Sequence, residues 1–174
     1  MFIGTPLITE EKIQKKVKEL AYRISQDYAN RDLLVIGILK GSIMFLSDLL
    51  KHIQVPVKID FIVASSYIKD KSSGEVKIHY FPREEIKDKD VLLVDDIIDT
   101  GISLKVIRDK ILELNPASLK ICVLLDKEER RVVDVPVDYI GFKIPNKFVV
   151  GYGLDYQEMF RNLPYITVFK KEIK

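Results

Sequence analysis

The chain has 174 residues, of which 47% are hydrophobic and 31% are charged, with a formal net charge of +2. This length and composition are typical of one well-packed globular domain, and so small a net charge does not favour nucleic acid as a partner. No apolar run approaches the ~20 residues of a membrane-spanning helix, and the single cysteine, Cys122, excludes an internal disulfide.

Helices and strands are predicted to alternate from residue 10 to residue 125. Most of the expected strands are short apolar runs, whereas residues 75–81 alternate like the returning arm of a hairpin, and each expected helix carries apolar residues at helical spacing. The expected helices cover about 10–30, 42–51 and 103–114, and the expected strands cover 33–39, 57–63, 75–81, 91–94 and 119–125. The polar segment 64–74 is expected to be a mobile loop between two of these strands.

Strands that are apolar on both faces and alternate with helices predict a doubly wound parallel sheet in an α/β fold. We expect one domain over residues 1–174, with its core at about 33–127. After Arg131 the sequence changes to short segments punctuated by proline and glycine. Residues of about 132–160, together with the N-terminal residues, are therefore expected to form a small irregular hood that covers the carboxyl edge of the sheet.

The segment Val91–Ser103 carries the most informative polar chemistry of the chain. Two carboxylates, Asp95 and Asp96, end an apolar strand, and the following turn holds Asp99 and the run 100–103. Ligands of open parallel sheets bind at the carboxyl ends of strands, and a helix N-terminus attracts phosphate through its free N–H groups. Because adjacent carboxylates suit a sugar diol or Mg²⁺, the segment predicts a pocket for a sugar phosphate.

This order of residues resembles the motif by which type I phosphoribosyltransferases bind phosphoribosyl pyrophosphate (PRPP). The resemblance implies that Asp95 and Asp96 hold the ribose hydroxyls and that Asp99 is the general acid/base next to purine N7. The residues implied to hold the 5′-phosphate are Thr100, Gly101, Ile102 and Ser103. Response-regulator receiver domains also carry an acidic pair after a strand, but near the N-terminus rather than in mid-chain.

A later part of the chain resembles the purine-binding stretch of hypoxanthine-guanine phosphoribosyltransferases. Lys127 follows a predicted strand, and residues 141–156 read Gly-Phe-Lys-Ile-Pro-Asn-Lys-Phe-Val-Val-Gly-Tyr-Gly-Leu-Asp-Tyr. The resemblance implies that Lys127 donates to the purine 6-oxo group and that the Phe148 ring stacks on the base. The implied purine contacts are Ile97, Lys127, Phe148, Val149 and Asp155. An ammonium group has no acceptor, so a lysine here favours a 6-oxo group over a 6-amino group.

Other segments resemble the parts of this family that hold pyrophosphate. The turn after the first predicted strand is the expected pyrophosphate loop, where the resemblance implies a cis peptide before Lys40. The pair Ser66-Tyr67 belongs to the expected loop that closes over the reaction. The implied pyrophosphate contacts are Leu39, Lys40, Gly41, Ser66, Tyr67 and Arg161, and the implied Mg²⁺ ligands are Asp95, Asp96 and Asp155.

Together the resemblances imply a purine salvage enzyme that converts hypoxanthine or guanine plus PRPP to the nucleotide plus pyrophosphate, with Mg²⁺ as cofactor. Relatives usually form dimers or tetramers, so a homodimer or homotetramer is expected, without nucleic acid or membrane partners. Residues 1–9 lack the basic-then-apolar order of a secretory signal, which favours a cytoplasmic location. Two alternatives stay open: a PRPP-sensing regulator that has lost catalysis, and a transferase that prefers adenine or xanthine. Lys127 disfavours only adenine.

Overall fold

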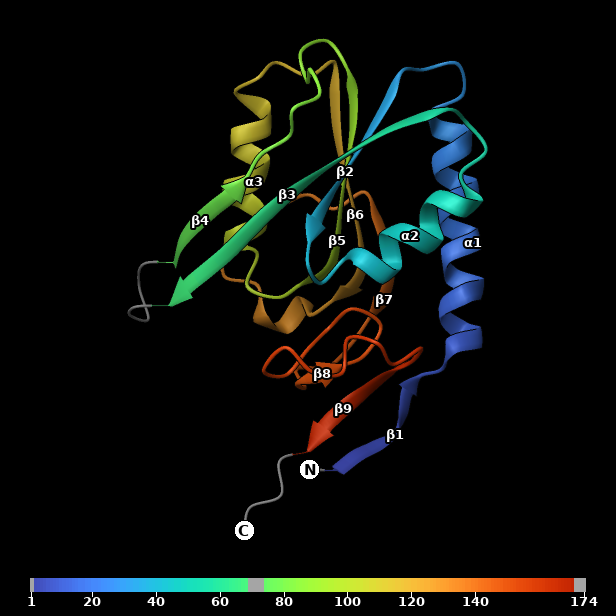
Figure 1. Ribbon diagram of the computed structural model, residues 1–174, viewed down its shortest axis with the longest axis vertical. Coiled ribbons are helices and arrows are strands. Elements are labelled where there is room, and N and C mark those ends of the chain that lie inside the picture. Colours follow the sequence, from blue (N-terminus) through green and yellow to red (C-terminus); the bar gives the residue numbers. More distant parts are fainter. Residues whose placement is uncertain (1, 69–73, 171–174) are drawn as a thin grey trace.

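The computed structural model describes the main chain of residues 2–68 and 74–170 and the side chains of residues 4–65 and 76–170. Within these residues, the central sheet has six strands in the order β4-β3-β2-β5-β6-β7 (Figure 1). The strands are β2 (Leu33–Leu39), β3 (Val57–Ile68), β4 (Gly74–Tyr80), β5 (Asp90–Ile98), β6 (Ser118–Asp126) and β7 (Tyr139–Lys143). β4 runs antiparallel to β3, and the other neighbouring pairs are parallel.

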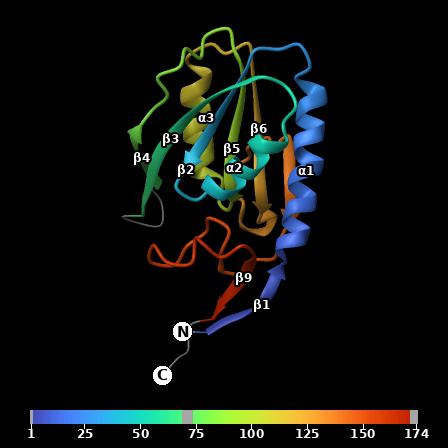
Figure 2. The same ribbon diagram turned by 45° about the vertical axis from the view of Figure 1, so that its right-hand side comes forward.

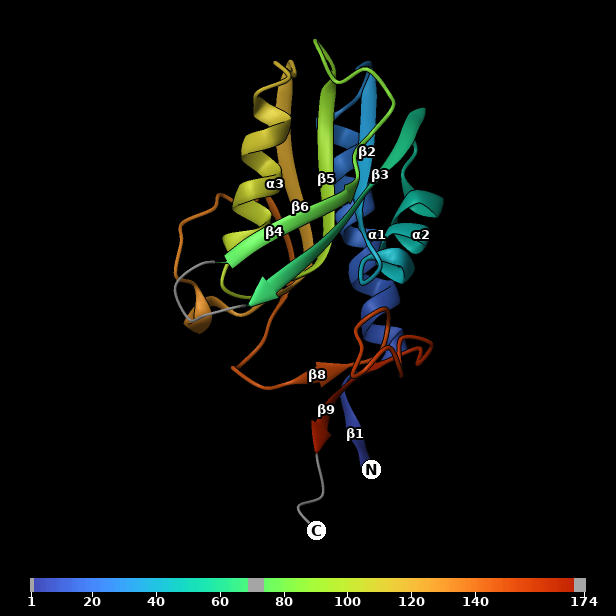
Figure 3. The ribbon, with the colours of Figure 1, turned by 60° about the vertical axis from the view of Figure 1, so that its left-hand side comes forward.

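Helices cover both faces of this sheet. α1 (Glu10–Asp27) and α2 (Ile43–His52) pack on one face, and α3 (Ile102–Leu112) packs on the other (Figure 3). None of the described helices is long and apolar enough to cross a membrane. Because alternate strand residues point to opposite sides, Leu92 of β5 joins the cluster under α1, whereas Leu93 joins the cluster under α3. The predicted doubly wound α/β sheet is therefore confirmed, with one antiparallel strand at its edge.

A second, three-stranded antiparallel sheet lies beyond the carboxyl edge of the first (Figure 2). It consists of β1 (Phe2–Ile8), β9 (Ile166–Lys170) and β8 (Val149–Val150). The buried Thr167 hydroxyl contacts the carbonyl oxygens of Gly4 and Thr5, at 3.1 and 3.0 Å, and so fastens β9 to β1. We call residues 2–8 and 144–170 the hood. β1 and β9 are strands that the sequence analysis does not predict.

The predicted start of the hood at about residue 132 is wrong. β7 belongs to the main sheet, where it pairs in parallel with β6 and buries Tyr139. A parallel crossover usually contains a full helix, but this one holds only a short 3-10 helix, η1 (Glu128–Arg130), followed by irregular chain. A connection without helical periodicity offers no sign of a parallel strand to come, which is why residues 139–143 are predicted as hood.

Two strands also run further than predicted. β3 continues to Ile68 and pairs with β4 there, so residues 64–68 form a strand rather than a loop. The rest of the expected loop, residues 69–73, lies outside the described residues. β5 continues through Ile98, because its ladder with β6 extends past the two carboxylates and pairs Asp95 with Val123. A backbone ladder satisfies main-chain groups whatever the side chains are, so polar residues can continue a strand.

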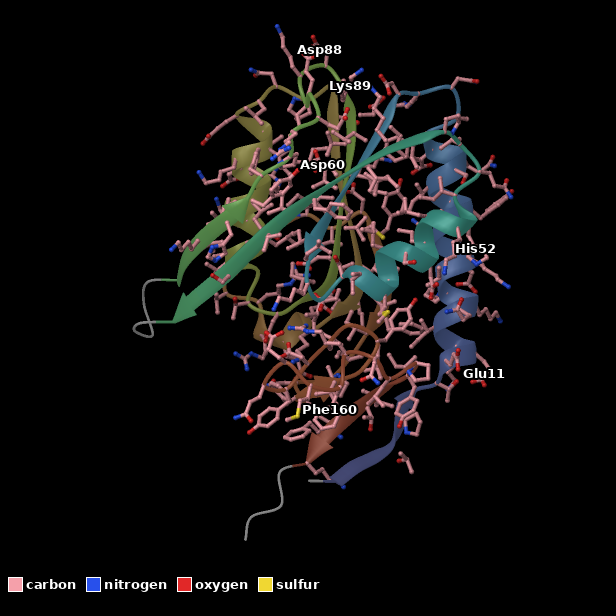
Figure 4. All side chains as sticks on the ribbon, viewed as in Figure 1. Glu11, His52, Asp60, Asp88, Lys89 and Phe160 are labelled. Atoms are coloured by element: carbon pink, nitrogen blue, oxygen red, sulfur yellow. The ribbon has the colours of Figure 1, made fainter. Side chains whose placement is uncertain are left out.

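A buried carboxylate fastens β3 to the segment between β4 and β5. The Asp60 side chain, labelled in Figure 4, accepts main-chain N–H groups from Phe61, Arg83 and Glu84 at 2.7–3.0 Å. The Tyr80 hydroxyl donates to the same carboxylate at 3.2 Å. Burial by itself would raise the pKa of Asp60, but these hydrogen bonds to the charged form outweigh burial and lower the pKa.

We predict that Asp60→Asn destabilises the protein at pH 7 by about 1.5–3 kcal/mol, because an amide cannot accept every one of these donors. A carboxyl with a lowered pKa in the folded state contributes stability that is lost as pH falls through that pKa. The gap between the wild type and Asp60→Asn should therefore narrow below about pH 4. Urea unfolding at pH 7 and at acidic pH measures both effects, with the exposed Asp134→Asn as control. A gap that does not change with pH would contradict the argument.

Candidate active site

Two cavities adjoin at the carboxyl edge of the main sheet. The first, which we call the Lys127 cavity, has a volume of about 300 Å³. It lies where the ends of β5 and β6 approach the hood. Its lining residues are Asp96, Ile97, Asp99, Lys127, Arg130, Asn146, Phe148, Val149, Leu154 and Asp155. All five residues that the sequence analysis names as purine contacts line this cavity.

The second cavity, which we call the Gly41 cavity, has a volume of about 470 Å³ and extends from the turn after β2 toward β3 and α3. It shares Asp96 and Asp155 with the Lys127 cavity, so the two cavities adjoin at these residues. Its lining residues are Ile38, Leu39, Lys40, Gly41, Ala64, Ser65, Val76, Asp95, Asp96, Ser103, Ile107, Asp155, Glu158 and Arg161. The side chains of Ser66 and Tyr67 lie outside the described residues, although their main chain continues β3.

The acidic pair Asp95 and Asp96 occupies the end of β5, at the edge of the Gly41 cavity. One oxygen of Asp95 accepts the N–H of Asp96 at 3.0 Å, and one oxygen of Asp96 accepts the N–H of Ile97 at 2.8 Å. Burial, followed by the neighbouring carboxylate, raises the pKa of Asp95 well above its ordinary range, and burial also raises the pKa of Asp96. Two negative groups this close favour a ligand that brings positive charge or hydroxyl donors.

The donor set fits a Mg²⁺ ion that takes most of its ligands from elsewhere. Within the described part of the chain, no group of three or more acidic, histidine or cysteine side chains is placed to hold a metal. Asp155, the third predicted ligand, instead pairs with Arg161 at 2.9 Å and accepts the N–H of Glu158 at 2.8 Å. Mg²⁺ commonly binds one or two carboxylates and completes its shell with substrate phosphates and water, so Asp95 and Asp96 suffice.

The turn after β2 approaches the acidic pair so closely that only glycine fits. A Cβ atom at Gly41 would clash with the Asp96 carboxylate. A Cβ atom at Gly153, which has a φ of 100°, would clash with the carbonyl oxygen of Gly41. The Leu39–Lys40 peptide is cis, as the resemblance implies. The turn after β2, the acidic pair and the hood therefore meet at one point.

Arg161 connects this point with the rest of the hood. Its Nη1 donates to the carbonyl oxygen of Gly153 at 2.7 Å, and its Nη2 lies 2.9 Å from Asp155 and 3.3 Å from Glu158. Glu158 also pairs with Lys40 at 3.0 Å, at the exposed mouth of the Gly41 cavity. The cations of Lys40 and Arg161 thus stand on the same side of the cavity, where they could bind an anion.

The turn between β5 and α3 presents a helix N-terminus to the same edge. Gly101 has a φ of 84°, a conformation that L side chains rarely adopt, and α3 begins directly after it at Ile102. The carbonyl oxygen of Thr100 accepts the N–H of Val132 at 3.1 Å, which holds the turn against the segment after η1. Ser103 lines the Gly41 cavity from the first turn of α3. The free N–H groups of this first turn suit a phosphate.

In the Lys127 cavity, two cations flank one carboxylate. The Lys127 main-chain N–H donates to the carbonyl oxygen of Ile98 at 3.0 Å, and its side chain is only 8% exposed. Its Nζ lies 3.9 Å from one oxygen of Asp99, and the Arg130 Nε lies 2.9 Å from the other. A buried ammonium that is not tightly paired can donate to a ligand in the cavity.

Phe148 belongs to an aromatic group at the mouth of the Lys127 cavity. Its ring makes edge contacts with Tyr156 and Phe169, both at 6.0 Å between centroids. The residue is 54% exposed, so this ring is not part of the apolar core. It can therefore offer a surface to a flat ligand, while Val149 beside it is buried in β8.

Several lining residues are not among the contacts that the sequence analysis names. Asn146 and Leu154 lie within the stretch 141–156 but are given no role there, and Arg130 follows Lys127 by three positions. Glu158 lines the Gly41 cavity only because the hood folds back toward Lys40. The adjacency of Arg130 to Lys127 is the one signal that could have included it, since a turn after a strand end brings both to the same edge.

Comparison with known proteins agrees with this geometry. The family model for the phosphoribosyl transferase domain matches residues 7–157. The hypoxanthine-guanine phosphoribosyltransferase of Streptococcus mutans serotype c is 47% identical over 168 residues, which cover 96% of this chain and 93% of the relative. The enzyme of the same name from Lactococcus lactis subsp. lactis is 49% identical, with coverage of 96% and 91%.

Solved structures share the fold throughout. A hypoxanthine phosphoribosyltransferase from Staphylococcus aureus superposes with a TM-score of 0.93 at 46% identity, covering 97% of this chain and 92% of that chain. A hypoxanthine-guanine phosphoribosyltransferase from Bacillus anthracis gives 0.93 at 46% identity, covering 97% and 100%. Family match, identity and coverage all lead to one assignment. The chain belongs to the type I phosphoribosyltransferase family, among its hypoxanthine-guanine phosphoribosyltransferases.

Proposed function

We propose that the protein transfers the phosphoribosyl group of PRPP to hypoxanthine or guanine and releases pyrophosphate. The observation that carries the proposal is that the two cavities adjoin at Asp96 and Asp155, which line both of them. A base in the Lys127 cavity and a pyrophosphate in the Gly41 cavity would lie on opposite sides of a ribose held at the acidic pair. That order is the one in which purine N9 can attack ribose C1′ as the bond to pyrophosphate breaks.

Selection of the base falls to Lys127. Its buried Nζ faces the cavity lined by Phe148 and Val149, and an ammonium can only donate. A 6-oxo group accepts this hydrogen bond, whereas a 6-amino group would leave two donors facing each other. The exposed ring of Phe148 contributes stacking that is common to all purines, on the order of 0.5–1.5 kcal/mol beyond burial.

Asp99 is the group that handles the proton. It lies at the wall of the Lys127 cavity, three residues after the ribose-binding pair. As N9 forms its bond to C1′, the purine loses the proton on N7, and the Asp99 carboxylate accepts it; the reverse reaction returns it. General base catalysis of this kind typically supplies about 10²–10⁴ in rate.

The two anionic groups of PRPP would be bound separately. Arg161 and Lys40 stand at the Gly41 cavity, where they would meet the charge of the departing pyrophosphate, and the N-terminus of α3 would bind the 5′-phosphate. Mg²⁺, when bound at Asp95 and Asp96 together with PRPP, would supply further positive charge to the leaving group. Asp95 and Asp96 themselves hold the ribose hydroxyls and offset the positive charge that builds on the ribose.

The setting of the enzyme is also part of the proposal. The one cysteine, Cys122, is buried and free, which fits a reducing cytoplasm. We expect the active form to be a homodimer or homotetramer that acts on small molecules, without nucleic acid or membrane partners. Ser66 and Tyr67 remain predicted contacts of a segment that closes over bound PRPP.

We predict Mg²⁺-dependent formation of inosine and guanosine monophosphates from PRPP and the matching base. Chromatography of the nucleotide and release of pyrophosphate measure the reaction with hypoxanthine, guanine, xanthine and adenine in turn. Removal of Mg²⁺ with a chelator should abolish turnover, and its re-addition should restore turnover. Turnover of adenine alone would contradict the assignment of hypoxanthine and guanine as the bases. Intact PRPP binding without any turnover would instead favour the regulatory alternative.

We predict that Asp99→Asn lowers kcat by at least tenfold while PRPP affinity stays within about twofold, because the amide keeps the size but cannot accept the proton. Steady-state kinetics and calorimetric titration with PRPP separate the two quantities. Asp109→Asn, which alters an exposed carboxylate of α3 paired with Lys105, is the matched control. A smaller loss would make Asp99 a structural member of the phosphate turn.

We predict that Lys127→Ala raises KM for hypoxanthine and guanine and leaves PRPP affinity of the free enzyme nearly unchanged. Loss of one charged hydrogen bond costs about 1.5–3 kcal/mol, or roughly ten- to a hundredfold in kcat/KM. The same kinetics and calorimetry apply. Equal losses for base and PRPP would mean that Lys127 supports the fold or the phosphates rather than selecting the base.

A further inference from the structure

Arg130 is a cation of the Lys127 cavity to which the proposed function gives no task. It ends η1, where its main-chain N–H donates to the carbonyl oxygen of Lys127 at 2.9 Å. Its side chain is 45% exposed and lines the cavity. The turn from Lys127 to Arg130 therefore delivers two cations to the same cavity from one short segment.

The contact of Arg130 is with the carboxylate that we assign to proton transfer. Its Nε lies 2.9 Å from Oδ1 of Asp99. This oxygen is buried and accepts no well-aligned hydrogen bond from any described residue, so its contact with Arg130 is an ion pair. The Lys127 Nζ lies 3.9 Å from the other oxygen, beyond hydrogen-bond distance. Arg130 is thus the nearest charged neighbour of Asp99 in the described part of the chain.

A carboxylate at the end of a short side chain can rotate about its Cβ–Cγ bond, and the torsion of this bond is broadly distributed. A planar guanidinium against one oxygen restricts that rotation and leaves the other oxygen for a ligand. Lys127 cannot do the same task, since its amine is needed for the 6-oxo group. We infer that Arg130 is a positioning residue that holds the Asp99 carboxylate toward N7 of the base. The inference rests on the proposed function, specifically on the role of Asp99.

If Arg130 only positions Asp99, its loss should lower kcat and leave substrate binding unchanged. Arg130→Met removes the charge but keeps an unbranched side chain in a half-exposed position, so the protein should fold. We expect kcat to fall on the order of tenfold to a hundredfold, as misplacement of a catalytic group does. KM for hypoxanthine and PRPP affinity should stay within about twofold. Arg130→Lys, which retains the charge without the planar fork, should recover part of the loss.

The decisive measurement is a double-mutant cycle with Asp99→Asn. If Arg130 acts through Asp99, then Asp99→Asn/Arg130→Met should have a kcat within about twofold of that of Asp99→Asn alone. The control is Lys143→Met, which removes the 2.8 Å ion pair with Glu128 on the outer side of the same turn. This control should keep wild-type kinetics.

Three outcomes would overturn the inference. Additive losses in the double variant would mean that Arg130 acts on the substrate directly. A higher kcat in Arg130→Met would mean that the ion pair restrains Asp99 from reacting. An unchanged kcat in Arg130→Met, beside a large loss in Asp99→Asn, would leave Arg130 without a role.

A wild-type kcat in Asp99→Asn alone would instead reject the role of Asp99 and, with it, the proposed mechanism. If Arg130→Met fails to fold, Arg130→Lys in the same cycle gives the same discrimination.

Discussion

The close contact of Gly41 with the Asp96 carboxylate on one side and with Gly153 on the other is the constraint on which the site depends. Gly41 belongs to the turn after β2, Asp96 to the end of β5 and Gly153 to the hood. These segments are distant in sequence, yet Gly41 lies directly against the Asp96 side chain and the Gly153 backbone, because neither glycine has a side chain. Asp96 and Arg161 both line the Gly41 cavity, and Arg161 also donates to the carbonyl oxygen of Gly153. The relative placement of the two cavities therefore follows from this one contact.

A partly buried polar network holds the hood in that position. The Tyr152 hydroxyl, next to Gly153, donates to Asp48 of α2 at 2.7 Å, and Gln14 of α1 donates to the same carboxylate oxygen at 2.8 Å. Burial would raise the pKa of Asp48, but these donors and Lys51 outweigh burial and lower the pKa. The hood is therefore fastened to both helices on one face of the sheet, close to Gly41. Hydrogen bonds to a charged acceptor are shorter and stronger than those between neutral groups, so this shared carboxylate joins the three elements firmly.

The sequence predicts those parts of the site that are contiguous. Asp95, Asp96 and the turn after them follow one apolar strand, so their place at the carboxyl edge needs only the order of residues. Lys127 is similar, because it directly follows β6. The missed features are those that depend on distant partners: β1 and β9 exist because they pair with each other, and β7 is in the sheet through a crossover without helical pattern. Arg130 is outside the predicted contacts for the same reason, since its contact with Asp99 crosses between two turns.

In the described part of the chain, each carboxylate of the site has a cation within ion-pair distance, except for the acidic pair Asp95 and Asp96. Asp99 has Arg130 and, more distantly, Lys127; Asp155 and Glu158 share Arg161, and Glu158 also has Lys40. Within the described residues, Asp95 and Asp96 have no ion-pair partner, and the pKa of each is raised. An uncompensated acidic pair beside the cations of Lys40 and Arg161 suits a substrate whose anionic end adjoins a part that carries hydroxyls and develops positive charge. PRPP in reaction with a purine has this distribution, which is why the same arrangement serves binding and catalysis.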